Sequence, residues 1–405
     1  MEDVNYKRIN RSVNIYPLFL GLTADLIFWI AINTLFLTTV KNMNASQINL
    51  IEAIGTAVGI LFQFIIIRIV RKIGNLNSVR LGTILLFFSV LLNMISTKFI
   101  GFLIAELCYV IGFVFKNMDN VILIKNLNYL NRSEEYIYYQ TKGSAIYSFI
   151  TLIISAISGF LFNINPYIPM IICLIICFNN FFLTFFMYEV PINKIEDNKT
   201  KKNNSKFNKE IILMLILYGL FYSMIACGQK NSKLFIQFDM QKFLSIDKVA
   251  IYMSIFIFIS RIARLMSNLI FMKVYNKFKK NLIFILEAFL ILSFCFLLIG
   301  NFLNNIIGIW IMAIGFFIYL FIRDPFSNYM RRLVFDHTSE LVHDKVINYL
   351  NLSRKIFSLI YSLIVSITLL KLNYTYVMLL LLFLSISFII LIIKIYNLVI
   401  KSENL

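Results

Sequence analysis

Long apolar segments separated by short polar ones run along almost the whole chain. We count twelve, at about 15–39, 47–68, 79–97, 99–118, 141–162, 167–189, 209–229, 247–271, 281–300, 305–323, 346–369 and 373–396. Each is about 18 to 25 residues long, which is the length that a helix needs to cross the hydrocarbon core of a bilayer. A transmembrane barrel would show alternating segments of ~10 residues instead. The pattern therefore predicts an all-α integral membrane protein with twelve transmembrane helices.

Composition supports this class and changes how the charge is interpreted. The chain is 60% hydrophobic and 14% charged, whereas soluble domains carry roughly 25% charged residues. The formal net charge of +18 would be compatible with a nucleic-acid partner. However, lysine and arginine concentrate in the even-numbered loops and the amino-terminal segment. This asymmetry predicts cytoplasmic termini in a multi-pass protein of the plasma membrane, in contact with lipids and without a nucleic-acid partner.

The most polar stretch, about 190–208, divides the chain into two similar halves. It has no periodic apolar pattern and is predicted to be a flexible linker, with a basic tether to lipid headgroups as the alternative. At the end of the fourth span of each half, Gly-Phe precedes a base and an acid: Lys116 and Asp119 in the first half, Arg323 and Asp324 in the second. Such duplication is typical of transporters. We predict a six-helix bundle at 1–189, a cytoplasmic linker at 190–208 and a second bundle at 209–405.

Twelve spans in two pseudo-symmetric halves, with a basic loop between the second and third spans, resemble the major facilitator superfamily. In that loop, "IRIVRKIGNLNSVRLG" keeps the family's glycine at Gly74, a base before it at Lys72 and a basic tail at Arg80. Arg71 stands where the family has an aspartate. The resemblance implies alternating access by rocking of the two halves around a central site lined mainly by spans one, four, seven and ten. It makes Arg71, Lys72 and Gly74 candidates for a cytoplasmic gate.

Two acids lie inside predicted spans at similar depth. Asp25 is about eight residues into the first span, and Trp29 and Asn33 follow it on the same helical face. Glu106 in the fourth span shares a face with Tyr109. A carboxylate at the bilayer centre costs about 2.5–3.5 kcal/mol, so such a residue usually faces a cavity or a partner. We predict that these five residues bind substrate or carry a coupled proton, with structural pairing to a buried base as the alternative.

Further candidates lie in the second half. Arg261 in the eighth span could bind an anionic substrate or neutralise an acid, and reaching to the headgroups is its alternative, as we expect for Arg264. Tyr218 and Tyr222 in the seventh span are candidate substrate contacts, with packing as their alternative. Glu287 in the ninth span is expected to pair with a nearby base.

The base–acid pairs at the cytoplasmic helix ends are candidates for a gate. Lys116 with Asp119, and Arg323 with Asp324, could form a latch between helices that breaks when the inner gate opens. Simple capping of the helix ends is the alternative.

The residue pattern disfavours an enzyme. The only histidines, His337 and His343, lack the spacing that puts two ligands on one helical face. The five cysteines lie in or beside apolar segments and are expected to be buried hydrophobes, so we expect neither a metal nor a cofactor. We therefore predict a monomeric secondary transporter that exports an amphipathic or lipophilic small molecule, with proton coupling as an open question. The alternatives are uptake of a small polar or anionic nutrient, and a receptor or scaffold that does not transport.

Overall fold

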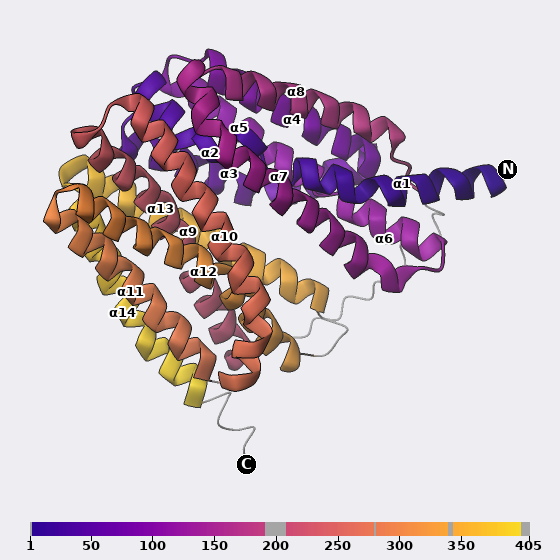
Figure 1. Cartoon of the computed structure of the whole chain (residues 1–405). Helices are drawn as coiled ribbons and strands as arrows, with labels where there is room; N and C mark the ends of the chain where they lie inside the picture. Colours follow the sequence, from indigo (N-terminus) through magenta and orange to yellow (C-terminus); the bar gives the residue numbers. More distant parts are fainter. Residues whose placement is uncertain (1, 191–207, 279–280, 339–342, 398–405) are drawn as a thin grey trace. The chain divides into compact units, whose positions relative to one another are not determined.

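The computed structural model describes residues 2–190, 208–278, 281–338 and 343–397, and every regular element in this part of the chain is helical (Figure 1). Twelve helical segments among these residues are long and apolar enough to cross a membrane. The predicted fold class, an all-α protein with twelve membrane-spanning helices, is therefore confirmed. The predicted linker falls on residues 191–207, which lie outside the described residues.

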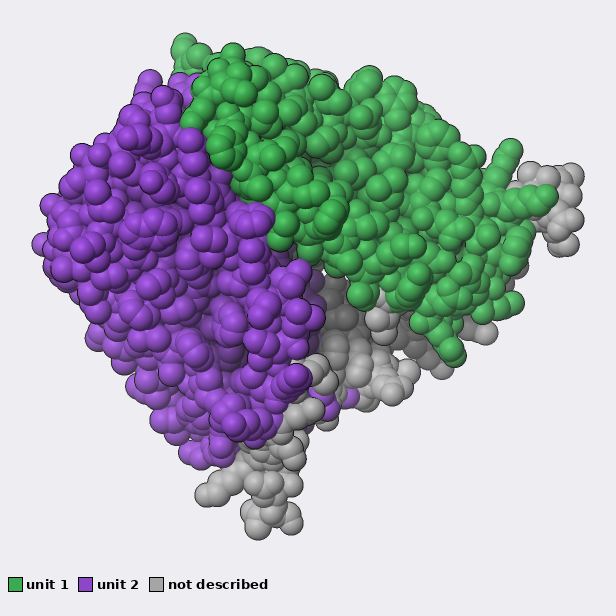
Figure 2. All heavy atoms as spheres, in the orientation of Figure 1, with its two compact units in different colours: residues 1–33, 58–205 green, residues 34–57, 206–405 purple. Residues whose placement is uncertain are grey.

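The chain forms two compact units, which are drawn in green and purple in Figure 2. Unit 1 comprises residues 1–33 and 58–205, and unit 2 comprises residues 34–57 and 206–405. The division thus assigns residues 34–57, which precede the linker in sequence, to the unit that contains most of the second half.

In unit 1, helices α4 and α5 pack closely where one of them carries a glycine. It contains α1 (Glu2–Thr23), most of α2 (Ile27–Leu35), the end of α3 (Ala45–Ile73), α4 (Asn75–Ile95), α5 (Phe99–Lys116), α6 (Asp119–Tyr129), η2 (Ser133–Glu135), α7 (Tyr136–Ile164), α8 (Ile168–Leu183) and η3 (Thr184–Phe186). A Cβ at Gly82 on α4 would lie 2.5 Å from the backbone nitrogen of Lys116 on α5. Small residues of this kind let membrane helices approach closely. Helix α1 packs against α6, α7 and α8.

Unit 2 is arranged around α9. It contains η1 (Phe36–Val40), the beginning of α3, α9 (Lys209–Phe243), α10 (Ile246–Phe278), α11 (Leu282–Leu303), α12 (Ile306–Asp336), α13 (His343–Lys371) and α14 (Tyr374–Ile395). Helix α9 packs against α12, α13 and α14. Both ends of α9 carry buried side chains, from Ile211 to Met240.

Two predicted spans differ from the structure. The first was predicted as one helix, but it breaks between Thr23 and Ile27, so the prediction that Asp25, Trp29 and Asn33 share one helical face is wrong. An aspartate can compete with helical hydrogen bonds by accepting from the local backbone, and Asp25 accepts from the amide of Leu26.

The predicted long loop after the seventh span, "KNSKLFIQFDMQKFLSIDK", is also wrong. Helix α9 continues through it to Phe243. Its polar residues, among them Asn231, Ser232, Gln237 and Asp239, are buried. Asn231, Gln237 and Asp239 have hydrogen-bond partners on other segments of unit 2, and Ser232 donates to the carbonyl oxygen of Gln229 on α9 itself.

Candidate functional site

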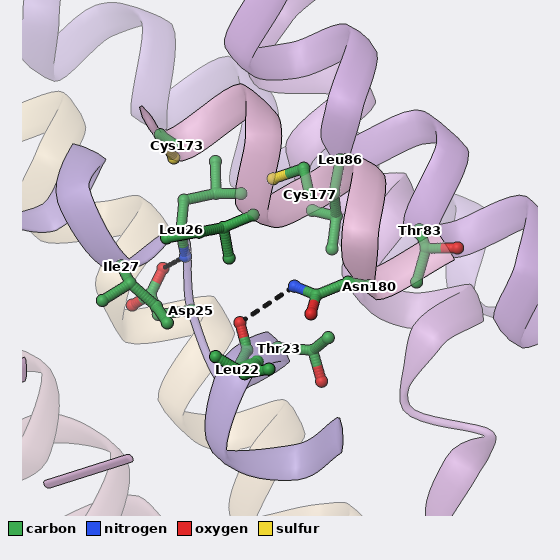
Figure 3. Close-up of a pocket in the computed structure, with 11 residues that line it drawn as sticks. Leu22, Thr23, Asp25, Leu26, Ile27, Thr83, Leu86, Cys173, Cys177 and Asn180 are labelled. Carbon is green, nitrogen blue, oxygen red and sulfur yellow. Dashed lines mark hydrogen bonds between the residues drawn. The ribbon is translucent and has the colours of Figure 1, made fainter. Parts of the chain in front are cut away.

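Asp25 lies at the break between α1 and α2 (Figure 3). Its Oδ1 accepts hydrogen bonds from the amide of Leu26 at 2.8 Å and from the hydroxyl of Tyr109 at 3.0 Å. On the other side of the break, Nδ2 of Asn180 donates to the carbonyl oxygen of Leu22 at 3.1 Å. Broken helices are tolerated at membrane depth where protein groups replace the lost backbone bonds or where the break lines a cavity. Side chains from α5 and α8 therefore hold this break in place.

A cavity opens beside the break, between α1, α4 and α8 (Figure 3). It contains about 290 Å³ of space not occupied by atoms, including its open mouth. Its lining is mostly apolar, with Thr23, Asp25, Thr83 and Asn180 as the polar members and two thiols, Cys173 and Cys177. All five cysteines are free, as expected. Within the described ranges, no group of three or more histidine, cysteine, aspartate or glutamate side chains could hold a metal ion.

Both predicted acids lie near Tyr109. Glu106 is one turn before Tyr109 on α5, and the carboxylates of Asp25 and Glu106 are both close enough to Tyr109 to interact with it electrostatically. Trp29 and Asn33 are half-buried on α2, beyond the break. The structure therefore brings together Asp25, Glu106 and Tyr109, which the sequence suggested as one site.

A second and more polar cavity lies inside unit 2, where residues 34–57 meet α9 and α13. It contains about 220 Å³ of unoccupied space, including its open mouth. It is lined by Asn49, Glu52, Ala226, Cys227, Lys230, Asn231, Ser358 and Ser362, of which only Ala226 lacks a polar or sulfur atom in its side chain. We call it the polar cavity. It offers a potential solute an acid, a base, two amides and two hydroxyls.

Four residues that line the polar cavity also belong to a row of contacts along α9, which we call the α9 seam. Lys230 forms an ion pair with Glu52, and Nδ2 of Asn49 donates to Oδ1 of Asn231 at 3.0 Å. Toward the Phe243 end of α9, Nε2 of Gln237 donates to Oγ1 of Thr38 at 2.5 Å. The seam also includes Ser46 and Ser366, whose hydroxyl oxygens lie 3.2 Å apart.

Sequence reasoning missed the polar cavity and the α9 seam because Lys230 and its neighbours were assigned to a loop. One signal was present in the sequence. Lys230, Lys233 and Gln237 recur at i, i+3 and i+7, which is a helical period. The partners Asn49 and Glu52, one turn apart in the second span, were overlooked.

Two arginines surround Tyr222 in unit 2. Arg323 on α12 donates from Nε to the hydroxyl of Tyr222 at 3.1 Å and from Nη1 to Oε1 of Gln229 at 3.3 Å. Its guanidinium carbon lies 5.6 Å from the centre of the Tyr222 ring, and that of Arg354 on α13 lies 5.2 Å from the same ring centre. The hydroxyl of Ser223 donates to the carbonyl oxygen of Arg354 at 2.7 Å. We call Tyr222, Arg323 and Arg354 the arginine cluster.

Asp324, which the sequence pairs with Arg323, forms an ion pair with Arg264 and is also close enough to Arg323 to interact with it electrostatically. Asp324 accepts two hydrogen bonds from Arg264, from Nε at 2.6 Å and from Nη2 at 3.1 Å. Consecutive residues on a helix point about 100° apart, so Arg323 and Asp324 meet different neighbours. The expectation that Arg264 only reaches to the headgroups is wrong, because Arg264 pairs with Asp324.

The other gate candidates lie at helix ends and turns in unit 1. Lys116 and Asp119 are buried and form an ion pair at 3.1 Å, which joins the end of α5 to the start of α6. Arg71 and Lys72 are exposed in the last turn of α3. Gly74 has a φ of +85°, a conformation that favours glycine, at the turn into α4. A role for these residues in gating stays a prediction.

Two further candidates lie on α9 and α10. Arg261 is half-buried on α10 and is close enough to Lys233 on α9 to interact with it electrostatically. Tyr218 is fully buried, with its ring stacked on Tyr222 at 5.6 Å between centres and its hydroxyl 3.3 Å from Oγ of Ser327. For Tyr218, the geometry favours packing.

The expectation that Glu287 pairs with a base is wrong. Its side chain is on α11 and the residue is 2% exposed. Neither carboxyl oxygen has a hydrogen-bond partner among the residues that the structure describes. Glu287 is thus a buried acid, and the phenol of Tyr361 lies close enough to interact with it electrostatically.

Replacing this acid should stabilise the protein. We expect Glu287→Met to raise the free energy of unfolding by about 1–3 kcal/mol, because burying a polar group without a partner is unfavourable. Thermal unfolding in detergent would show a higher melting temperature. The control is Glu189→Met, since the Glu189 carboxylate accepts from Asn75, from the amide of Leu76 and from Lys125. That variant should be less stable, and a destabilised Glu287→Met would contradict the prediction.

Comparison with known proteins identifies the fold. No family model and no curated protein matches the chain. Among solved structures, the nucleoside transporter NupG covers 96% of this chain and 99% of its own at 12% identity, with a TM-score of 0.76. A bacterial homologue of the iron transporter ferroportin, in an inward-facing state, covers 96% and 98% at 13% identity and 0.67. The inward-open xylose transporter XylE from E. coli covers 96% of both chains at 12% identity and 0.66. The chain therefore has the fold of major facilitator superfamily transporters.

Proposed function

We propose that this chain is a secondary transporter whose substrate is a small polar molecule bound in the polar cavity of unit 2. The observation that supports this proposal most strongly is the lining of that cavity. Its residues Glu52, Lys230 and Asn231 lie on helices long and apolar enough to cross a membrane. Charged and amide groups at membrane depth are costly, and they usually mark a substrate or ion pathway. The fold shared with transporters supports the same conclusion.

This proposal favours the polar-nutrient alternative over export of a lipophilic compound. A lipophilic substrate gains little from a cavity in which almost every side chain offers a polar atom, because those atoms would lose partners without compensation. A small polar solute can satisfy them.

The proposed mechanism is alternating access, with the halves 1–189 and 209–405 as the moving bodies. The α9 seam joins residues of the first half to α9 and α13 of the second. From the distribution of basic loops, we propose that the seam lies on the outer side of the polar cavity. It then has to open whenever the cavity opens outward.

We also propose that Asp25 and Glu106 couple transport to protons. The support is their shared position near Tyr109 at a broken membrane helix. A carboxylate can take up one proton and release it again. This is what a carrier of protons requires.

Counterflow in proteoliposomes tests the proposed function. Vesicles containing the purified protein would be preloaded with nucleosides, sugars, amino acids or small carboxylates, and entry of the labelled solute measured. We expect at least one polar solute to exchange, with a rate at least about tenfold lower in Asn231→Ala because a buried amide contact is lost. The control is Asn93→Ala, since Asn93 is also a buried asparagine, and its amide donates to the carbonyl oxygen of Ser89 on its own helix. Exchange limited to lipophilic compounds and unchanged in Asn231→Ala would overturn the proposal.

A further inference from the structure

We infer that Cys173 and Cys177 form a binding site for a soft monovalent metal ion, such as Cu⁺ or Ag⁺, in the cavity beside the break between α1 and α2. This site lies in unit 1 and does not depend on the function proposed for the polar cavity of unit 2. The apolar segment that contains these cysteines predicted only buried hydrophobic side chains. The structure adds that both thiols line the same cavity (Figure 3).

The two thiols lie on one face of α8. Cys173 and Cys177 are four residues apart, a spacing that places Cβ atoms roughly 5–6 Å from each other on a helix. Both residues are buried, with exposed fractions of 1% and 5%, and both line the cavity. The thiol of Cys177 is close enough to Cys173 to interact with its sulfur as a hydrogen-bond donor. One ion between the two side chains would therefore contact both sulfur atoms.

The first turn of α2 is directed at Cys173. The first N–H groups of a helix have no carbonyl partner within that helix, and α2 begins at Ile27 because of the break at Asp25. The backbone N–H groups of Phe28 and Trp29 lie within hydrogen-bonding reach of the Cys173 sulfur. Such amides stabilise a negative charge, and the thiolate is the form of cysteine that binds a metal ion. The break thus supplies donors to a sulfur ligand.

Other residues of the lining favour a cation. The carboxylate of Asp25 is close enough to Cys173 to interact with it electrostatically. Asn180, three residues after Cys177 on α8, also lines the cavity and is 5% exposed. Its Nδ2 donates to the carbonyl oxygen of Leu22, whereas its Oδ1 has no hydrogen-bond partner among the residues that the structure describes. A buried acceptor without a donor is costly, and a bound ion is one way to compensate it.

The ligand set narrows the class of metal. Thiolate ligands select soft ions such as Cu⁺, and two thiolates are enough to hold such an ion. Structural Zn²⁺ takes four ligands in a tetrahedral arrangement. Within the described part of the chain, no third histidine, cysteine or acidic side chain completes a set with these thiols. Hard ions such as Mg²⁺ prefer oxygen ligands. The pair therefore suits a soft monovalent ion.

Competition for Cu⁺ tests this inference. The purified full-length protein, in detergent under anaerobic reducing conditions, would compete with the chelator bicinchoninate, and the absorbance of the copper chelate would be measured. We expect one Cu⁺ to bind each chain. Cys173→Ser and Cys177→Ser should each lower the affinity at least about hundredfold, because a hard oxygen replaces a soft ligand. Cys227→Ser is the matched control, since Cys227 is also a buried thiol that lines a cavity but has no second thiol beside it there. That variant should bind Cu⁺ as the parent protein does.

Measurements on the parent protein do not depend on how the variants fold. X-ray absorption at the copper edge should show two sulfur neighbours of the bound ion. Zn²⁺ should bind at least about hundredfold more weakly than Cu⁺. Three results would each contradict the inference: copper with only nitrogen or oxygen neighbours, unchanged Cu⁺ affinity in both serine variants, and Zn²⁺ bound as tightly as Cu⁺. None of them bears on solute exchange through the polar cavity, so the proposed function is tested separately.

Discussion

Lys230→Glu should reduce counterflow at least about tenfold, and the double variant with Glu52→Lys should recover most of it. In the single variant, two carboxylates replace the ion pair of the α9 seam. The side chains of Lys230 and Glu52 are 23% and 37% exposed, so water screens them in part. The expected cost lies between ~1 kcal/mol for an exposed pair and ~3–5 kcal/mol for a buried one. A cost above 1.4 kcal/mol already shifts a conformational equilibrium tenfold.

The double variant tests whether transport requires the attraction between these two charges, or the particular residue at each position. It restores opposite charges at the same two positions, so the seam can close again. The control is Lys242→Glu on the same helix, because Lys242 pairs with Asp239 but is 47% exposed. That variant should stay within about twofold of the parent protein. If the double variant is as inactive as Lys230→Glu, then attraction between these two side chains is not what transport requires.

Asp25→Asn should abolish accumulation driven by a pH gradient while leaving exchange of solute intact. Asparagine is nearly isosteric, and its oxygen can still accept from the Leu26 amide and the Tyr109 hydroxyl. The break between α1 and α2 should therefore keep its shape. An amide cannot take up a proton, so the proposed coupling is lost. Accumulation should fall to the level of vesicles without protein.

Two measurements on the same vesicles separate coupling from damage. Accumulation would be followed under an imposed pH gradient, and exchange would be followed at equal pH on both sides. Asp239→Asn is the matched control, since Asp239 bonds to Lys242 and Tyr374 at the far end of α9. Its accumulation should resemble that of the parent protein. Normal accumulation in Asp25→Asn would remove Asp25 from the coupling mechanism, whatever the exchange rate.

The membrane-spanning architecture was accessible from sequence for a local reason. Each span has to satisfy its own backbone hydrogen bonds within the bilayer, so length and apolar composition are sufficient to identify it. The same reasoning identified Asp25 and Glu106 as unusual, because an acid in such a segment is costly wherever its partners lie. Their meeting at Tyr109 followed from comparable depth on two spans.

The other features depend on contacts between residues that are distant in sequence. Lys230 and Glu52 are separated by 178 positions, and without Glu52 the stretch after Gln229 has the composition of a polar loop. Likewise, Asp324 is next to Arg323 in sequence but binds Arg264, since only the packing of α10 against α12 determines which base it meets. The sequence by itself determined twelve spans and two acids within them, because those depend on each segment and the bilayer. The polar cavity, the α9 seam and the arginine cluster depend on which helices pack together, and only the tertiary structure decided them.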